Sequence, residues 1–271
     1  MTAGYIDFKD WKLYYEMEGK GEPLVLCHAG FVDSRMWDDQ WDSFTQNYKV
    51  LRFDMCGFGK SDPVSEPVSR RQELYDLLQK LDIKRANLLG CSMGGQMVID
   101  FTLEHPEMVS SLIIVNGTPG GFEMQGEPPS QILEMFQAIE KGDLKRVSEL
   151  QIHLWVDGIY RHTQQVDPHI RQKAAEMNRI AVENETWAKA DAQPFNPLNP
   201  PAVERLSEIS IPTLILVGSL DHPEILRAAD LLVNKISGAK KIILSDTAHV
   251  PNMEKPAEFN QITLDFLSSV R

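Results

Sequence analysis

Ser92 lies in the segment Gly90–Gly94, a G-x-S-x-G pattern in which glycines flank a hydroxyl side chain. A hydroxyl group becomes a nucleophile when a neighbouring base removes its proton, so the pattern indicates attack on an electrophilic carbon. The two glycines leave room for a sharp strand-to-helix turn that projects the serine oxygen. The bare pattern arises by chance in about one of ten chains of this length. The strand before it and the helix after it must therefore decide whether Ser92 is a nucleophile.

An acid and a base follow Ser92 in the chain order that this kind of turn requires. Asp221 lies in the loop after the apolar run 214–217, and His249 lies after the run 242–244. We therefore predict a catalytic triad in which His249 is the general base and Asp221 orients it. Taken alone, Asp221 is also typical of a helix N-cap, and His249 of a hydrogen-bonded loop residue.

Three other residues compete for the acid and base roles. Asp246 precedes His249 by only three residues, which favours a turn-capping role. Asn116 follows the strand run 112–115, another position for an acid, but an amide carries no charge to stabilise an imidazolium. His222 neighbours Asp221 and would point away from the site if Asp221 faces it.

A second loop follows the apolar run 24–27 and continues through His28 to Phe31. Its small residues favour a backbone N–H group that faces a substrate oxygen, so we predict the amides of Phe31 and Met93 as an oxyanion hole. His28 is predicted to be a scaffold residue. By itself, the segment is also compatible with a plain loop.

Short apolar runs alternate with helical patterns and would position these loops. The apolar runs cover 24–27, 50–53, 87–89, 112–115, 214–217 and 242–244, and helical spacing covers 73–81, 94–104, 224–236 and 257–270. This alternation predicts an α/β fold with a doubly wound, mostly parallel sheet. An opening hairpin is expected over residues 4–17.

The alternation stops between residues 119 and 206, where apolar residues recur at helical spacing. We predict a helical cap over 119–206 and a core formed by 1–118 and 207–271. Such an insertion would cover the carboxyl edge of the sheet, where open α/β sheets bind ligands. Cap residues that would either line an apolar pocket or, more often, form the cap's own core are Phe122, Met124, Met135, Phe136, Trp155, Tyr160 and Trp187.

Together with the glycine-rich turn 54–61, these motifs resemble the α/β-hydrolase superfamily along nearly the whole chain. They are similar to the branch of small carboxylesterases, enol-lactonases, cofactor-free perhydrolases and carbon–carbon bond hydrolases. The resemblance implies a serine hydrolase that acts on a small, largely apolar ester through an acyl-enzyme. Alternatives are carbon–carbon cleavage or enol-lactone opening by the same triad, and a ligand receptor with little turnover.

Three residues depart from that family pattern. Ala29 stands where the oxyanion loop usually has Gly, Cys56 where the turn often has Arg, and Cys91 where many members have His or Asn. Ala29 would narrow the loop and Cys91 would change the polarity beside the nucleophile. We do not expect Cys91 itself to be the nucleophile, since the position before the turn's apex should point into the protein.

The composition of the 271 residues narrows the partners. A formal net charge of -12 without clustered basic residues argues against nucleic acid. The three cysteines match neither a disulfide framework nor a metal site, and no apolar run approaches the roughly 18 residues of a membrane span. We expect a cytoplasmic enzyme with a small-molecule substrate, no cofactor, no metal and no membrane partner, and a homo-oligomer is compatible with this composition.

Overall fold

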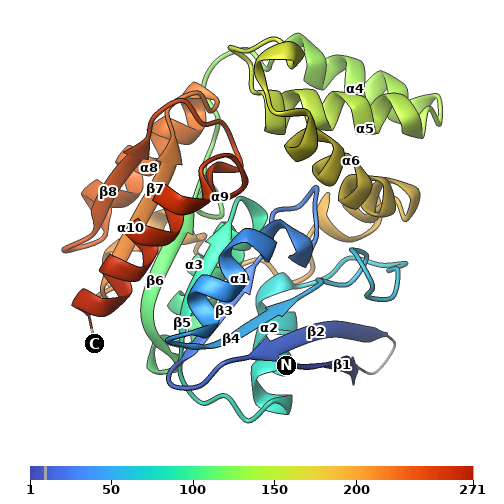
Figure 1. The fold of residues 1–271 in the computed structure, drawn as a ribbon. Coiled ribbons are helices and arrows are strands. Elements are labelled where there is room, and N and C mark those ends of the chain that lie inside the picture. Colours follow the sequence, from blue (N-terminus) through green and yellow to red (C-terminus); the bar gives the residue numbers. More distant parts are fainter. Residues whose placement is uncertain (9–10, 271) are drawn as a thin grey trace.

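The computed structural model describes residues 1–8 and 11–270. An eight-stranded sheet crosses the molecule in the order β1-β2-β4-β3-β5-β6-β7-β8 (Figure 1). β1 (Thr2–Asp7) and β2 (Lys12–Glu18) form the predicted antiparallel hairpin, and β2 also pairs antiparallel with β4 (Lys49–Phe53). Lys9 and Asp10 of the hairpin, and Arg271 of the predicted core, lie outside the described residues.

The remaining strand pairs are parallel, which confirms the predicted α/β fold with a mostly parallel sheet. These strands are β3 (Pro23–Cys27), β5 (Ala86–Cys91), β6 (Val109–Val115), β7 (Thr213–Gly218) and β8 (Lys240–Leu244). Parallel strands place their carboxyl ends along one edge, so the loops that follow β3, β5, β7 and β8 open in the same direction.

Successive side chains of each strand enter two different cores, because they point to opposite faces of the sheet. Val25 packs on one face with residues of α2 (Arg70–Lys80), α3 (Met93–Glu104) and α8 (Pro223–Lys235). Leu24 packs on the other face with residues of α1 (Asp38–Thr45) and α10 (Pro256–Ser269). Burial on both faces explains why the strands are continuous apolar runs rather than alternating ones.

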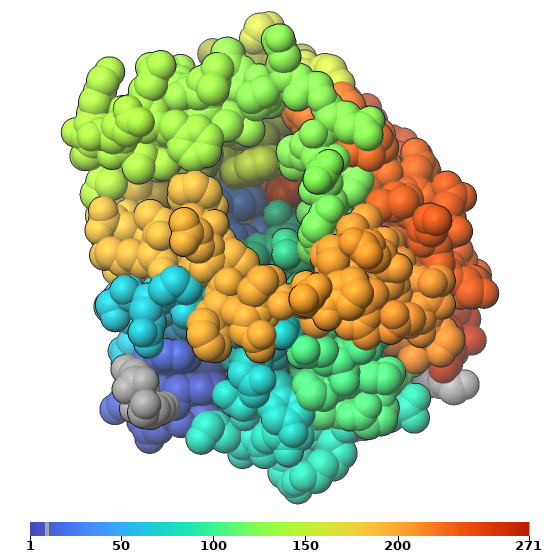
Figure 2. Space-filling view, turned by 180° about the vertical axis from the view of Figure 1, so that it is seen from behind, coloured from blue at the N-terminus to red at the C-terminus, as the bar shows by residue number. Residues whose placement is uncertain are grey.

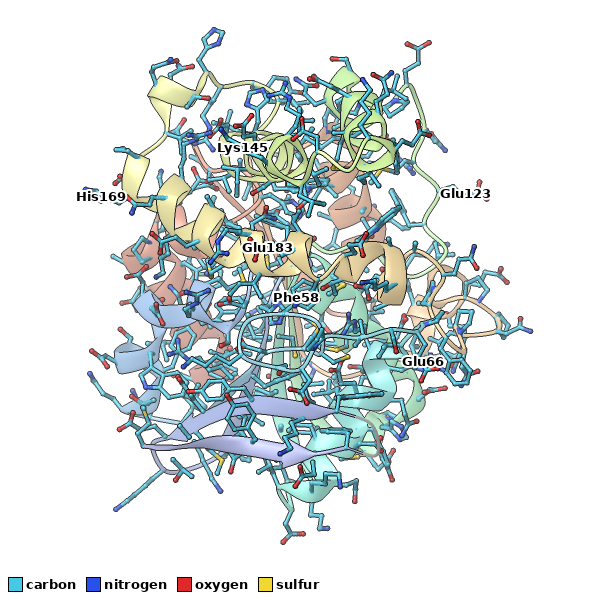
Figure 3. All side chains as sticks on the ribbon, turned by 90° about the vertical axis from the view of Figure 1, so that its right-hand side faces the viewer. Phe58, Glu66, Glu123, Lys145, His169 and Glu183 are labelled. Atoms are coloured by element: carbon cyan, nitrogen blue, oxygen red, sulfur yellow. The ribbon has the colours of Figure 1, made fainter. Side chains whose placement is uncertain are left out.

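Between β6 and β7 the chain forms a helical layer beyond the edge of the sheet (Figure 1). Its longer helices are α4 (Ser130–Glu140), α5 (Leu144–Ile152) and α6 (Pro168–Glu183), and π-helical turns follow at His153–Asp157 and Trp187–Asp191. Glu123 and His169 extend outward on opposite sides of this layer (Figure 3). Residues 119–206 as a separate cap remain a prediction, although Ile152 and Met177 share a buried cluster with the sheet.

The turn between β5 and α3 brings backbone into contact with backbone. A Cβ added to Gly90 would lie 2.1 Å from the carbonyl oxygen of Gly94, and one added to Gly94 would lie 2.3 Å from that of Cys27. Ser92 between them has φ +53° and ψ -114°, a conformation that side-chain-bearing residues rarely adopt. Both glycines are therefore required by the packing of the turn.

We expect Gly94→Ala to destabilise the protein by about 2–3 kcal/mol, because the new methyl group overlaps a backbone oxygen of the neighbouring strand. In thermal unfolding this corresponds to a Tm lowered by roughly 4–12 °C. Gly4→Ala is the control, since its methyl group would meet nothing closer than 3.9 Å. Equal Tm values for the two variants would contradict the packing argument.

Candidate functional site

Ser92, His249 and Asp221 form one chain of hydrogen bonds at the carboxyl edge of the sheet. His249 Nε2 lies 2.8 Å from Ser92 Oγ, and His249 Nδ1 lies 2.6 Å from Asp221 Oδ2. His249 is 2% and Asp221 3% exposed, so solvent scarcely competes for these bonds. The structure thus brings the three predicted residues together in an arrangement that lets an imidazole accept a proton from a hydroxyl group.

Neighbouring groups hold the carboxylate and the ring in place. Asp221 Oδ1 accepts a hydrogen bond of 2.7 Å from the backbone N–H of His222. His222, not Asp221, is the N-cap of α8, so the N-cap alternative for Asp221 is wrong. Trp155 and Phe31 cover the His249 ring, with ring centroids 4.8 and 6.3 Å away.

Asn116 braces the loop that carries His249. Its Oδ1 accepts a hydrogen bond from the N–H of Gly218 at 3.0 Å, and its Nδ2 donates to the carbonyl of Ala248 at 3.1 Å. The amide therefore connects the ends of β6 and β7 to the residue before His249. Asp246 has an 84% exposed side chain and φ +54°, which agrees with the predicted turn role.

The backbone amides of Phe31 and Met93 donate no hydrogen bond to any residue within 1–8 or 11–270. Their loops touch, since a Cβ added to Gly30 would lie 3.1 Å from Met93 Sδ. The carbonyl of Phe31 accepts a 2.9 Å hydrogen bond from Asn178 of α6, whose amide also donates to Gln151 at 2.6 Å. A helix of the insertion therefore holds the loop on which the amide of Phe31 lies.

His28 and Cys91 are buried beside the site without facing it. His28 Nε2 accepts a hydrogen bond from the N–H of Met55 at 3.0 Å, and Nδ1 donates to the carbonyl of Ala29 at 2.9 Å. Burial lowers the pKa of His28 to about 4, which keeps it neutral and suits a scaffold residue. Burial raises the pKa of the Cys91 thiol, which argues against a thiolate nucleophile.

Arg161 connects the insertion to the loop that carries His249. Its Nη1 donates to Glu254 Oε2 at 2.6 Å, and the side chains of Arg161 and Glu254 are only 11% and 7% exposed. Glu254 Oε1 accepts from the N–H of Ala248 at 2.7 Å, directly before His249. Burial raises the pKa of Glu254, and the positive charge of Arg161 opposes that shift. The buried carboxylate of Glu254 is therefore stabilised only while Arg161 is present.

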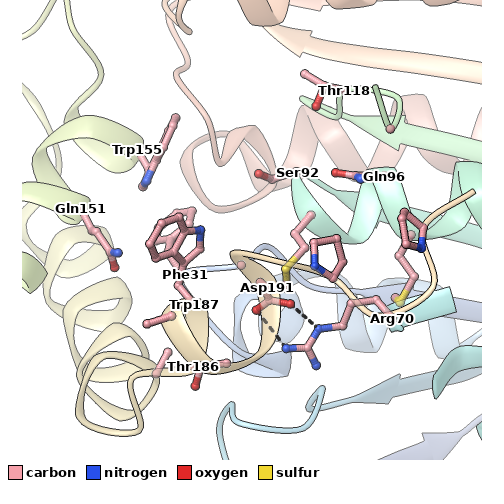
Figure 4. A pocket seen from close by; sticks show the side chains of 18 of the residues that line it. Phe31, Arg70, Ser92, Gln96, Thr118, Gln151, Trp155, Thr186, Trp187 and Asp191 are labelled. Carbon is pink, nitrogen blue, oxygen red and sulfur yellow. Dashed lines mark hydrogen bonds and ion pairs between the residues drawn. The ribbon is translucent and has the colours of Figure 1, made fainter. Parts of the chain in front are cut away.

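A cavity of about 570 Å³ opens above Ser92, between the sheet and the helical layer (Figure 2). Figure 4 shows Gln96 and Thr118 on one side of Ser92 and Trp155 and Phe31 on the other. Of the aromatic and methionine residues predicted for a pocket, the cavity is lined by Met124, Met135, Trp155 and Trp187, but not by Phe122, Phe136 or Tyr160.

Both arginines that line the cavity are already paired. Arg70 Nε lies 2.8 Å from Asp191 (Figure 4) and its Nη1 lies 3.0 Å from Glu73, while Arg71 Nε lies 2.5 Å from Glu104. Each guanidinium is thus neutralised by a carboxylate. Neither offers a free charge to a ligand.

Asp100 of α3 is a carboxylate in the cavity wall that the sequence did not suggest. Its Oδ1 is buried and has no hydrogen-bond partner among the described residues, and no ion pair to Asp100 is found there. Burial raises the pKa of Asp100 to about 7. Asp100 lies on α3, eight residues after the N-cap Ser92, and this position gave no local signal that the side chain lines a cavity.

The described part of the chain contains neither a cluster of metal ligands nor a helix able to span a membrane. No group of three or more His, Cys, Asp or Glu side chains is arranged there to hold a metal ion. None of the helices in that part combines the length and the apolar character needed to cross a membrane.

The chain is similar to known proteins over almost its whole length. The family model described as alpha/beta hydrolase fold matches residues 22–256. A 2-hydroxy-6-oxononadienedioate/2-hydroxy-6-oxononatrienedioate hydrolase of Paraburkholderia xenovorans is 27% identical over 277 residues, which cover 95% of this chain and 91% of the relative. A 2-hydroxy-6-oxo-6-phenylhexa-2,4-dienoate hydrolase of Comamonas testosteroni is 26% identical over 286 residues, with 96% and 93% covered.

Among solved structures, the enol-lactonase of Burkholderia xenovorans has a TM-score of 0.79. It is 22% identical, and the match covers 98% of this chain and 100% of that one. At this identity the likeness concerns the fold.

We expect Arg161→Met to lower the free energy of unfolding by about 3–5 kcal/mol, because Glu254 would be left buried without its cation. Urea denaturation would measure the loss. The double variant Arg161→Met/Glu254→Met is the control and should recover most of it, since it removes both charges. A loss below about 1 kcal/mol in the single variant would contradict the role of this ion pair.

The raised pKa of Asp100 predicts a pH-dependent stability. Between about pH 4 and pH 7, an unfolded Asp has lost its proton whereas Asp100 in the folded protein still holds one, so stability falls as the pH rises through this range. Asp100→Asn removes this fall in stability, because an amide does not titrate in this range. We expect the gain in unfolding free energy from Asp100→Asn to be about 2–3 kcal/mol larger at pH 8 than at pH 5.

Denaturation at the two pH values measures this difference. Asp265→Asn, on the exposed side of α10, is the control and should show no such dependence. A gain for Asp100→Asn that is the same at both pH values would show that the folded protein does not raise the pKa of this carboxyl.

Proposed function

The chain belongs to the α/β-hydrolase fold family, and on that premise we propose that it is a serine hydrolase acting on a small, largely apolar ester. The observation that carries the proposal is the buried chain of hydrogen bonds from Ser92 through His249 to Asp221. A nucleophile, a base and an orienting carboxylate are the three groups that acyl transfer needs.

In the proposed mechanism, Ser92 Oγ attacks the ester carbonyl carbon while His249 Nε2 takes its proton. Asp221 stabilises the imidazolium, and the amides of Phe31 and Met93 bind the oxyanion, each worth roughly 3–4 kcal/mol in comparable enzymes. The carbonyl re-forms as the C–O bond to the alcohol breaks, and His249 returns its proton to the leaving alkoxide. Water, deprotonated by His249, then attacks the acyl carbon, and the bond to Ser92 Oγ breaks as His249 returns the proton to Ser92, which releases the acid.

The cavity supports a small and mainly apolar substrate. Its volume of about 570 Å³ lies within the range of small-molecule sites, and Met124, Met135, Trp155 and Trp187 contribute apolar surface. Trp155 also packs against the His249 ring, so its indole lies beside the base in the cavity. We also propose that the protein is cytoplasmic, needs no cofactor and is compatible with a homo-oligomer. These three points are inferred from the sequence alone.

Carbon–carbon bond hydrolysis is the second candidate, and the names of the relatives from P. xenovorans and C. testosteroni favour it. Dioate and dienoate substrates carry carboxylates, which require cations or hydrogen-bond donors in the site. The cavity arginines Arg70 and Arg71 are already paired, and Asp100 offers no positive charge. These groups disfavour an anionic substrate. An enol-lactone is itself an ester, so the same triad would open it.

We expect Ser92→Ala and His249→Ala to lower kcat/KM for p-nitrophenyl butyrate by on the order of 10⁴-fold or more, since each removes a group that acts in every turnover. Asp221→Asn should cost about 10⁴-fold through the wrong histidine tautomer. Release of p-nitrophenol measures all three. Ser65→Ala, in an exposed loop, is the matched control and should retain wild-type activity.

A Ser92→Ala variant that keeps more than a tenth of the wild-type rate would refute the proposed nucleophile. Ligand binding without any turnover by the wild-type protein would favour the receptor alternative. Cleavage of 2-hydroxy-6-oxo-6-phenylhexa-2,4-dienoate with a kcat/KM tenfold above that for the ester would instead establish carbon–carbon bond hydrolysis.

A further inference from the structure

Three polar residues occur at intervals of four, beginning at Ser92, the N-cap of α3, and continuing along the helix. Ser92, Gln96 and Asp100 all line the cavity, so one side of this helix forms a polar strip in a largely apolar chamber. Ser92 and Gln96 lie side by side in Figure 4. The proposed mechanism uses the first of the three and leaves the carboxylate of Asp100 without a task.

Within residues 1–8 and 11–270, the carboxylate of Asp100 has no counterion of its own. The positive groups whose charge reaches it are Arg71 and Arg205, and they are paired with Glu104 and Glu208. Asp100 Oδ1 is buried without a hydrogen-bond partner in that part of the chain, which costs stability unless a partner is supplied. In a cavity wall, the partner can come from a ligand.

The backbone leaves room beside Asp100 at Gly120. A Cβ added to Gly120 would lie 3.3 and 3.5 Å from the two carboxylate oxygens of Asp100 and 3.4 Å from Gln96 Nε2. Gly120 also lines the cavity. The carboxylate and the amide therefore face one space, which any larger residue at position 120 would narrow.

We propose that Asp100, together with Gln96, binds a primary ammonium group of the substrate where α3 lines the cavity. An ammonium group offers three hydrogen-bond donors and a positive charge, which match an unpaired carboxylate and an amide better than a neutral hydroxyl group does. The proposal rests on the proposed function and specifies its substrate as an ester that carries an amine.

The spacing sets the length of that substrate. Eight residues of α-helix rise about 12 Å, and the side chain of Asp100 leans back toward the N-terminus, which shortens the distance to Ser92. An extended chain advances roughly 1.2 Å per bond. The ammonium group would thus be separated from the scissile carbonyl by on the order of eight bonds, with apolar carbon between them.

Binding of n-octylamine and of 1-octanol at pH 8 tests the proposal, because the two probes share one chain and differ in charge. Isothermal titration calorimetry should show the amine bound at least tenfold more tightly than the alcohol by the wild-type protein. The amine should also compete with p-nitrophenyl butyrate. Asp100→Asn should reduce the ratio of the two affinities to about one, and the control Asp265→Asn should leave it unchanged.

Gly120→Ala provides a second variant, since its methyl group would enter the space beside Asp100 while the acid is kept. It should lower the affinity for the amine more than that for the alcohol. Equal affinities in the wild-type protein, or a preference that survives in Asp100→Asn, would overturn the proposal.

Calorimetry does not depend on turnover, so the two proposals fail separately. Amine binding that requires Asp100 in a protein that hydrolyses no ester would refute the proposed function and keep the ammonium site. Ester hydrolysis without any preference for the amine would refute the ammonium site and keep the proposed function.

Discussion

Backbone packs directly against backbone at the turn between β5 and α3, where the carbonyl oxygens of Cys27 and Gly94 leave no space for side chains on two glycines. This close approach holds Ser92 at φ +53°, a conformation that costs roughly 1–3 kcal/mol and persists only because the surroundings impose it. The strain projects Oγ beyond the sheet edge, toward His249. It also places the first amides of α3, with their positive end of the helix dipole, beside the same oxygen.

The helices between β6 and β7 do more than cover this turn. Asn178 holds the carbonyl of Phe31, and Arg161 reaches Glu254, which in turn holds the amide before His249. The two loops beside Ser92 are thus each restrained by a side chain of the insertion. A change in the position of these helices would alter the geometry around Ser92 as well as the shape of the cavity.

Local patterns were sufficient for the strands, for helices α2, α3, α8 and α10, and for bringing Ser92, Asp221 and His249 together, because each of these three residues lies in the loop that follows an apolar strand. Helix α1 was missed, since its sequence DDQWDSFT is mainly polar. Phe136 was expected in a pocket or in the cap core and is 41% exposed. The contact of Asn178 with Phe31 could not be predicted, because the two residues are 147 positions apart in the sequence. The unpaired state of Asp100 could not be predicted either, because only the fold shows which groups surround its carboxylate.

In the proposed mechanism, Ser92 is a nucleophile that His249 activates. Reaction with a fluorophosphonate, followed by intact-mass measurement and peptide mapping, tests this role. We expect one adduct per chain, located on the peptide that contains Ser92, and strongly reduced labelling when His249 is replaced by Ala. An unlabelled wild-type protein, or an adduct that persists in Ser92→Ala, would contradict this role.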